Sequence, residues 1–138
     1  MPDKLAVASS TAELVERYFD VINNDKWDEL AALLHPDVRI QHGMSFSCEG
    51  IESAVRFYQA IIRQFDEHED RPTRILVDGS AAAVEITFTG TKTDGTPLTF
   101  PAADFIDTDG QRITKVSSWY DTAVAIPLIK GLPSAAGS

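Results

Sequence analysis

The sequence predicts an α+β fold in which helices cover one face of an antiparallel sheet. Its first half carries apolar residues at helical spacing, and its second half carries alternating, strand-like segments. Three hairpin-type pairs punctuate that second half, namely Asp78-Gly79, Asp94-Gly95 and Asp109-Gly110. Helices followed by antiparallel strands are the order expected when a layer of helices packs on a single sheet.

Three helices are expected in the first half of the chain. The first begins with capping-box spacing at Ser10 and ends at Asn23. The second spans 27–34 and is ended by His35-Pro36, because a residue before proline resists the helical conformation. The third spans 52–65 and carries a broad apolar stripe.

Five strands should form the sheet, and the first of them ends in a histidine, His42. The expected strands are 38–42, 73–77, 81–89, 98–106 and 113–120. Around them we expect a flexible N-terminus at 1–9, loops at 43–50 and 66–70, one folded domain at 10–121, and an apolar C-terminal extension at 122–138. That extension is expected to cover a cavity mouth or to pack on a partner subunit.

The composition is that of one globular domain, with 138 residues, 43% of them hydrophobic and 24% charged. A net charge of −9 argues against nucleic acid and anionic membrane surfaces as partners, since both attract clustered Lys and Arg. The single Cys48 allows no internal disulfide, which fits a reducing compartment. With no long apolar run and no signal-peptide core, we expect a cytoplasmic protein.

Four segments occur in an order typical of one superfamily. They are RYFDVINNDKWDELAALLHPDVRIQH (17–42), GIESAVRFYQAI (50–61), VDGSAAAVEITFTGT (77–91) and DGQRITKVSSWYD (109–121). Over roughly 11–121 the chain resembles the SnoaL-like and ketosteroid-isomerase-like branch of the NTF2-like superfamily. The resemblance implies a cone of three helices packed on a curved, mostly antiparallel sheet that encloses an apolar cavity. It also implies a homodimer formed across the outer face of the sheet.

Such a cavity is the default binding site of a small domain, and its expected occupant is a small apolar molecule. Three of the expected lining residues come from the third helix and three from the strands. For each of them, ordinary core packing is the alternative. The expected ligand-binding residues are Phe57, Tyr58, Ile61, Phe88, Phe105 and Trp119.

The resemblance also suggests which polar residues carry chemistry. Tyr18 matches the oxyanion-hole tyrosine of ketosteroid isomerases, His42 matches their general-base aspartate, and Asp104 lies near their second oxyanion-hole acid. Asp121, which closes SSWYD, matches an aspartate frequent in SnoaL-like cyclases, whose single acid/base carboxyl could be Asp121 or Asp104. A neutral imidazole can remove a proton next to a carbonyl, and a buried hydroxyl or protonated carboxyl can donate to the enolate.

Each of these candidates has a structural alternative. Tyr18 could be a core residue, His42 a polar residue at a strand end, and Asp121 a cap on the last strand. The orientation of Asp104 depends on strand register, because a slip of one residue turns its side chain out of the cavity.

No metal or cofactor is expected. The three histidines lack zinc-type spacing, and the sequence holds neither a glycine-rich phosphate loop nor a nucleophile elbow. Epoxide-hydrolase relatives use an Asp–Arg–Asp set, for which Arg56 and Arg74 are poorly placed. Scytalone-dehydratase relatives use tyrosines, histidines and an aspartate, which Tyr18, His42 and Asp104 partly match.

The sequence therefore predicts a cofactor-independent acid/base enzyme of cyclase, isomerase or dehydratase type. Its expected substrate is a small apolar carbonyl compound, such as a polyketide or a steroid-like molecule. The alternative is a non-catalytic module of the same fold that binds a small ligand or dimerises.

Overall fold

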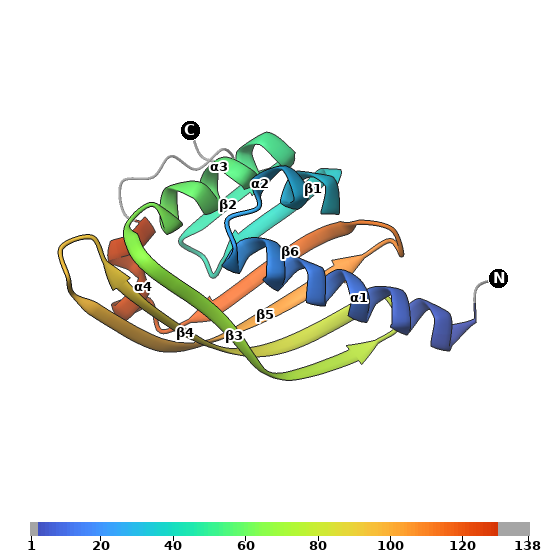
Figure 1. Cartoon of the computed structure of the whole chain (residues 1–138). Helices are drawn as coiled ribbons and strands as arrows, with labels where there is room; N and C mark the ends of the chain where they lie inside the picture. Colours follow the sequence, from blue (N-terminus) through green and yellow to red (C-terminus); the bar gives the residue numbers. More distant parts are fainter. Residues whose placement is uncertain (1–2, 130–138) are drawn as a thin grey trace.

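A computed structural model of the protein describes residues 3–129 (Figure 1). It contains four helices and six strands in the described part of the chain. The helices are α1 (Lys4–Asn23), α2 (Trp27–Leu33), α3 (Ile51–Ile62) and α4 (Thr122–Ile129). The strands are β1 (Leu34–His42), β2 (Phe46–Glu49), β3 (Phe65–Asp78), β4 (Ala81–Lys92), β5 (Pro97–Thr108) and β6 (Ile113–Tyr120).

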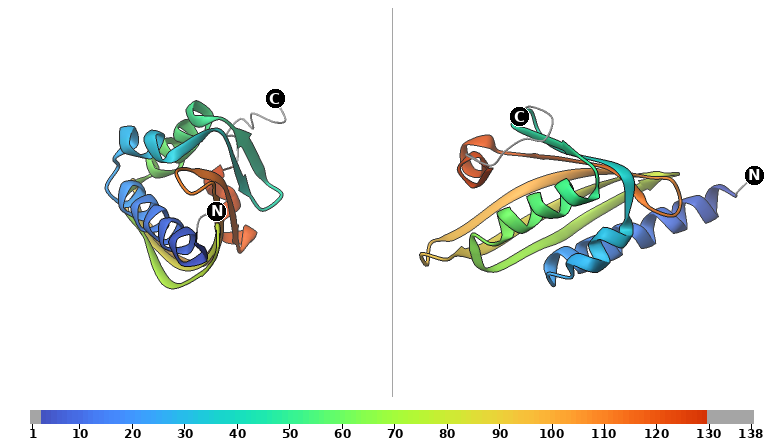
Figure 2. Two further views of the ribbon diagram at one scale, coloured as in Figure 1. Left: turned by 90° about the vertical axis from the view of Figure 1, so that its right-hand side faces the viewer. Right: turned by 90° about the horizontal axis from the view of Figure 1, so that it is seen from above.

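The strands form one curved, mixed sheet in the order β2-β1-β6-β5-β4-β3. All neighbours are antiparallel except β1 and β6, which run parallel. Figure 2 shows the sheet curling around α1, while α2 and α3 lie beside it. The predicted α+β class and curved sheet are confirmed, and α4 adds a helix to the three expected.

Helix α1 begins earlier than the sequence suggested. Asp3 is its N-cap and accepts a hydrogen bond from the Leu5 amide at 3.0 Å, so the predicted start at Ser10 is wrong. Residues 4–9 are helical, and the expectation of a flexible segment is wrong there. The helix buries a stripe that includes Val15, Tyr18 and Ile22, which places Tyr18 in the core.

Two predicted loops are strands. Residues 43–50 contain β2, which pairs with β1, and the acidic 66–70 segment lies in β3. Because β3 is an edge strand with alternate side chains in solvent, charged residues are accommodated and even favoured there. The third helix ends at Ile62 rather than at 65, since Phe65 already belongs to β3.

Strand β1 starts four residues earlier than predicted and includes Pro36. Proline cannot donate to a sheet ladder, and Pro36 lies where the β1–β6 register shifts between Leu34 and Arg39. The predicted strand over 113–120 and the three predicted hairpin turns are confirmed.

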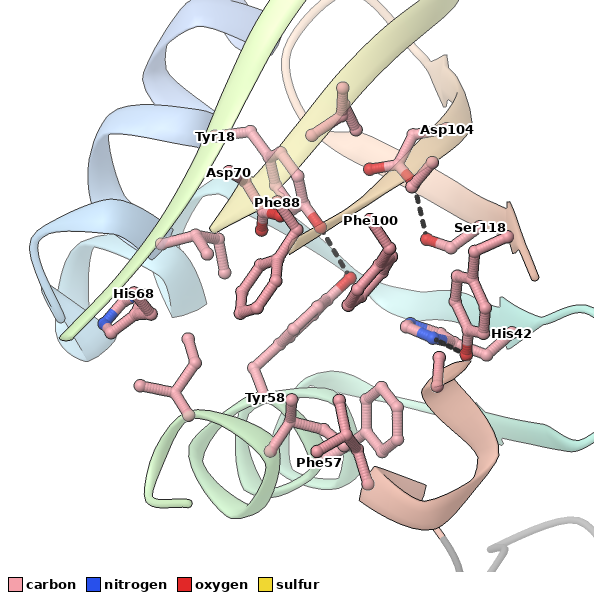
Figure 3. Close-up of a pocket in the computed structure, with 18 residues that line it drawn as sticks. Tyr18, His42, Phe57, Tyr58, His68, Asp70, Phe88, Phe100, Asp104 and Ser118 are labelled. Atoms are coloured by element: carbon pink, nitrogen blue, oxygen red, sulfur yellow. Dashed lines mark hydrogen bonds between the residues drawn. The ribbon is translucent and has the colours of Figure 1, made fainter. Parts of the chain in front are cut away.

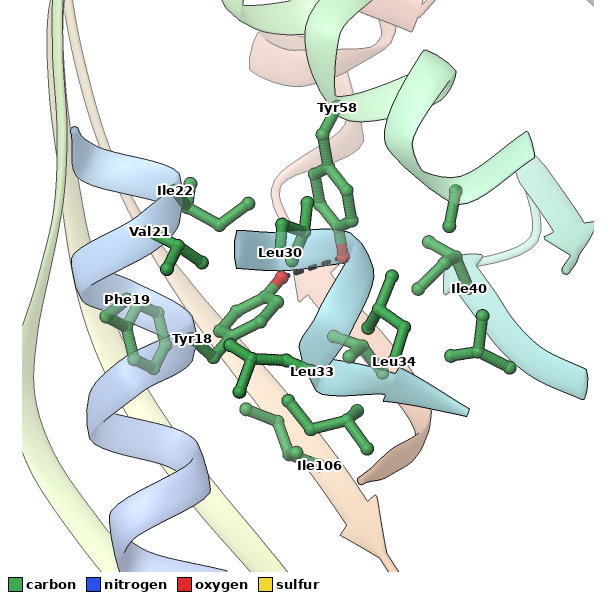
Figure 4. Close-up of a cluster of buried hydrophobic side chains, with 14 of the residues drawn as sticks. Tyr18, Phe19, Val21, Ile22, Leu30, Leu33, Leu34, Ile40, Tyr58 and Ile106 are labelled. Atoms are coloured by element: carbon green, nitrogen blue, oxygen red, sulfur yellow. Dashed lines mark hydrogen bonds between the residues drawn. The ribbon is translucent and has the colours of Figure 1, made fainter. Parts of the chain in front are cut away.

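The main core lies between the helices and the concave face of the sheet (Figure 4). A second, aromatic cluster forms where α4 meets the sheet, from Phe65, Phe88, Phe100, Ala125 and Leu128. Within residues 3–129, every helix is too short or too polar to cross a lipid bilayer.

Candidate active site

The helices and the concave sheet face enclose a cavity of about 90 Å³ (Figure 3). Its walls are mostly aliphatic and aromatic, and they come from α1, α3, α4 and every strand except β2. The polar residues in the lining are Tyr18, His42, Tyr58, His68, Asp70, Asp104, Ser118 and Tyr120.

Three of these polar residues form one row across the sheet. The register pairs His42 of β1 with Ser118 of β6, and Ser118 with Asp104 of β5. Residues directly opposite one another on paired strands share a face, so all three side chains point into the cavity. The register therefore places Asp104 inward, as the enzyme hypothesis requires.

Asp104 is a carboxyl group in largely apolar surroundings. Its side chain is 6% exposed, and its Oδ1 accepts a hydrogen bond of 2.6 Å from the Ser118 hydroxyl. Burial raises the pKa of Asp104 to about 7; the Ser118 hydrogen bond opposes this rise and the charge of Asp70 adds to it. Such a carboxyl can both accept and donate a proton at neutral pH.

Two tyrosines from different helices form a hydroxyl dyad. The Tyr18 hydroxyl of α1 donates to the Tyr58 hydroxyl of α3 at 2.7 Å (Figure 4). Burial raises the pKa of both phenols above the ordinary value, so both remain protonated. Because Tyr58 accepts from Tyr18, its own hydrogen can be donated to a ligand in the cavity.

His42 does not have the properties expected of a general base. Its Nδ1 lies 2.7 Å from the Tyr120 hydroxyl, and its ring centroid lies 4.6 Å from that of Phe57. Burial lowers the pKa of His42 to about 3, which makes the imidazole neutral and weakly basic. Asp104 is therefore the better base in this cavity.

Asp70 is a second cavity carboxyl that the sequence analysis assigned to a solvated loop. Asn23 holds its backbone, accepting from the Asp70 amide at 2.8 Å and donating to its carbonyl at 2.9 Å. Burial raises the pKa of Asp70 to about 6, and the nearby His68 opposes the rise. His68, Asp70 and Pro72 are partly buried on one face of β3, but this acidic segment has no apolar alternation in its sequence that could have placed Asp70 in the cavity.

Two predicted ligand-binding residues lie outside the cavity. Phe105 and Trp119 are 53% and 46% exposed, on the opposite face of the sheet. Successive strand residues point to opposite faces, so Phe105 faces away when Asp104 faces inward, and Trp119 faces away when Ser118 does. The other four predicted residues, Phe57, Tyr58, Ile61 and Phe88, do line the cavity.

Asp121 also lies outside the cavity lining. It is exposed, and its Oδ1 accepts a hydrogen bond of 2.9 Å from the Ala123 amide at the start of α4. That contact caps the start of α4, whereas the alternative interpretation had been a cap on the end of the last strand. Its predicted catalytic role has no support from this geometry.

Helix α4 closes one side of the cavity. Ala125 and Leu128 are in the lining, and the Gln64 side chain donates to the Leu128 carbonyl at 2.7 Å. The expectation that the extension covers the cavity holds for these described residues. Residues 130–138 lie outside the described part of the chain.

The described residues offer little for other chemistries. No group of His, Cys, Asp and Glu within residues 3–129 could hold a metal ion. Arg56 and Arg74 pair with Glu52 and Glu85 at the surface, and no arginine is in the cavity lining. Burial raises the pKa of Cys48 to about 11, which keeps it a thiol.

The raised pKa of Asp104 predicts a pH-dependent stability. Between about pH 4 and 7 the folded state holds a proton that the unfolded state releases, so stability falls as pH rises through this window. Relative to Asp104→Asn, the wild type should lose on the order of 4 kcal/mol between pH 4 and 8, taking 1.36 kcal/mol per pH unit. Urea unfolding of both proteins measures the difference, and parallel curves would contradict it.

The wild type is compared with Asp104→Asn because His42 changes the pH dependence of stability in the opposite direction. The unfolded state holds its proton between about pH 3 and 6.5, so stability gained from His42 rises with pH there. That contribution is present in both proteins and cancels in the comparison.

A curved sheet wrapped around helices, with a mainly apolar cavity and a few inward polar groups, defines an NTF2-like protein. A family description for the SnoaL-like domain matches residues 15–116. The chain therefore belongs to the SnoaL-like domain family, as its sequence resemblance indicated.

Solved structures share this fold. A protein from Jannaschia sp. CCS1, assigned to the SnoaL-like polyketide cyclases, is 19% identical, with a TM-score of 0.80 over 96% of this chain and 100% of that one. An LEH-like epoxide hydrolase of M. tuberculosis is 20% identical, with a TM-score of 0.76 over 91% of this chain and 93% of that one. A protein from Kribbella flavida DSM 17836, assigned as a ketosteroid isomerase, is 29% identical, with a TM-score of 0.70 over 83% of this chain and 79% of that one. Comparison with curated proteins gives no match.

Proposed function

We propose that the protein is a cofactor-independent acid/base enzyme that moves a proton next to a carbonyl group. The observation that carries this proposal is the buried Asp104 carboxyl, which faces the same apolar cavity as the Tyr18–Tyr58 dyad. The proposed substrate is a small apolar carbonyl compound of polyketide or steroid-like type. The cyclase and isomerase assignments of similar folds agree with this chemistry.

In the proposed mechanism, the Asp104 carboxylate removes a proton from the carbon beside the carbonyl. The C–H electron pair moves to the carbonyl oxygen, and the Tyr58 hydroxyl donates a hydrogen bond to the resulting enolate. Tyr18 donates to Tyr58 and so makes Tyr58 a stronger donor. Protonated Asp104 then returns its proton to the product.

The fate of the enolate would decide the type of reaction. Return of the proton to a different carbon gives an isomer, attack of the enolate carbon on a second carbonyl gives a ring, and loss of a β-hydroxyl gives a dehydrated product. In this mechanism Asp104 replaces His42 as the base, because the imidazole is weakly basic and the carboxyl is matched to neutral pH.

Exchange of α-protons in heavy water tests this proposal without knowledge of the natural substrate. 2-Tetralone is a suitable apolar ketone, and proton NMR follows the loss of its α-proton signals. The wild-type protein should accelerate the exchange near neutral pH, and Asp121→Asn should be equally active because that carboxylate is outside the cavity. Binding of the ketone without acceleration would favour the alternative role of ligand carrier.

We also propose that the protein forms a homodimer through the outer face of its sheet. Phe105 and Trp119 are exposed there as diagonal neighbours, because Phe105 pairs with Ser117 and Ala103 with Trp119. Large apolar side chains grouped on a surface are typical of an interface.

The dimer can be tested by sedimentation velocity. The wild type should sediment as a dimer, and the double variant Phe105→Ser/Trp119→Ser should shift toward monomer because the apolar contact is removed. Met44→Ser is a matched control, since Met44 is 99% exposed but lies in the β1–β2 turn. A wild-type protein that stays monomeric at high concentration would contradict the proposal.

A further inference from the structure

His42 carries a buried polar atom that the proton-transfer mechanism leaves unused. Its Nε2 has no hydrogen-bond partner among the described residues, although the atom is shielded from solvent and the side chain lines the cavity. Among the buried side-chain nitrogen and oxygen atoms of residues 3–129, it is the one without a partner. Folded proteins satisfy nearly all such atoms, because an unsatisfied one costs free energy. An unsatisfied polar atom on a side chain that lines a cavity points to a ligand.

Tyr120 determines which nitrogen of His42 carries the proton. The Tyr120 hydroxyl lies 2.7 Å from Nδ1. Either the hydroxyl donates to an unprotonated Nδ1, or a protonated Nδ1 donates to the Tyr120 oxygen. A phenol is a stronger hydrogen-bond donor than a neutral imidazole N–H, and an imidazole nitrogen is a stronger acceptor than a phenol oxygen. Tyr120 therefore donates to Nδ1, and the single ring proton resides on Nε2.

The surroundings hold the imidazole in this state and orientation. The Phe57 ring meets it edge to face at 4.6 Å, and the Tyr120 ring lies at 5.5 Å. The cavity carboxyl nearest to His42 in the sheet register is Asp104, which lies two strands away, about 10 Å between Cα atoms. Its Oδ1 accepts a hydrogen bond from Ser118 on the strand between them. The Nε2–H is thus a fixed, neutral donor.

We propose that His42 is a ligand-recognition residue whose Nε2–H donates to a second oxygen of the ligand, separate from the oxygen bound by Tyr58. The cavity then selects small apolar molecules with two acceptor oxygens, such as diketones or keto esters. This inference rests on the proposed function for the role of Tyr58. The recognition by His42 itself requires no proton transfer from carbon.

The first test is nitrogen NMR of the full chain labelled with ¹⁵N-histidine. His42 is assigned by its loss in His42→Gln. Its Nε2 should be protonated and its Nδ1 unprotonated, and Tyr120→Phe should give a mixture of tautomers because the donor to Nδ1 is gone. A proton on Nδ1 in the wild type, or a doubly protonated ring at pH 6, would overturn the inference.

The second test uses 2-heptanone and 2,6-heptanedione, flexible probes that differ in one carbonyl group. Their dissociation constants are measured by NMR titration in the wild type, His42→Ala and His42→Gln. The wild-type preference for the dione over the mono-ketone should fall roughly two- to tenfold in His42→Ala, as expected for one hydrogen bond. His42→Gln, which retains a neutral donor, should restore part of it.

Phe88→Leu is the matched control, because Phe88 lines the apolar wall and has no donor. It should weaken the binding of both ketones equally. A preference unchanged in His42→Ala, together with an Nε2 resonance that the dione does not move, would refute recognition by His42. The wild-type protein could instead fail to accelerate 2-tetralone exchange while His42→Ala still lowers the preference for the dione. That outcome would refute only the proposed enzyme activity.

Discussion

Replacing Asp104 with Asn should lower the rate of 2-tetralone exchange by about 10²–10⁴-fold, the usual contribution of a positioned acid/base group. Asn has nearly the shape of Asp and can still accept the Ser118 hydrogen bond, so the cavity should be preserved. It cannot take up a proton from carbon. The loss should therefore appear in the exchange rate and leave the affinity for 2-tetralone nearly unchanged.

Asp121→Asn is the matched control for this variant, because it makes the same chemical change on a carboxylate outside the cavity. The pH profile adds a second criterion. With a pKa of about 7 for Asp104, wild-type exchange should rise as pH increases through neutrality, since only the carboxylate accepts a proton. Exchange that survives in Asp104→Asn would assign the base to another group, and the second cavity carboxyl, Asp70, would be the next to change.

Replacing Tyr58 with Phe should lower the exchange rate by about 10²–10³-fold, the range measured when one oxyanion donor is removed. The Tyr58 hydroxyl is the member of the dyad whose hydrogen is free for the enolate oxygen. Tyr18→Phe should have a smaller effect, because Tyr18 acts on the enolate through Tyr58. The specific prediction is that the exchange rate falls more in Tyr58→Phe than in Tyr18→Phe.

Stability measurements separate this effect from damage to the fold. Each variant removes one member of the same buried hydrogen bond, so their free energies of unfolding should fall by similar amounts, about 1–3 kcal/mol. Similar stability losses with unequal rate losses would support the assignment. If Tyr18→Phe were the slower enzyme, Tyr18 would be the direct donor and Tyr58 its support.

Much of the fold could be predicted because local patterns agree with the tertiary structure. The three hairpin turns and β6 were found from Asp-Gly pairs and alternation. The errors occur where a neighbour distant in sequence decides the structure. The four residues of β2 become a strand by pairing with β1, and β3 tolerates its acidic residues because it forms the edge of the sheet.

The candidate site was predicted only in part from the sequence. The resemblance brought Tyr18, His42 and Asp104 to attention, and the structure places all three in the cavity lining. Asp104 and Phe105 cannot both face the cavity, since neighbours in a strand face opposite sides of the sheet. Alternation applied strictly would have removed Phe105 from the predicted site.

Local sequence patterns predicted the class of fold and most of its helices and strands, and the resemblance identified Tyr18, His42 and Asp104 as candidates for proton chemistry. The roles that we propose for those side chains depend on contacts that form only in the tertiary structure. The contacts that set their properties join residues 14 apart for Asp104 and Ser118, 40 apart for Tyr18 and Tyr58, and 78 apart for His42 and Tyr120. Burial and partners shift a pKa, and both arise when the sheet closes over the helices. For that reason we propose Asp104 as the base and His42 as a neutral donor.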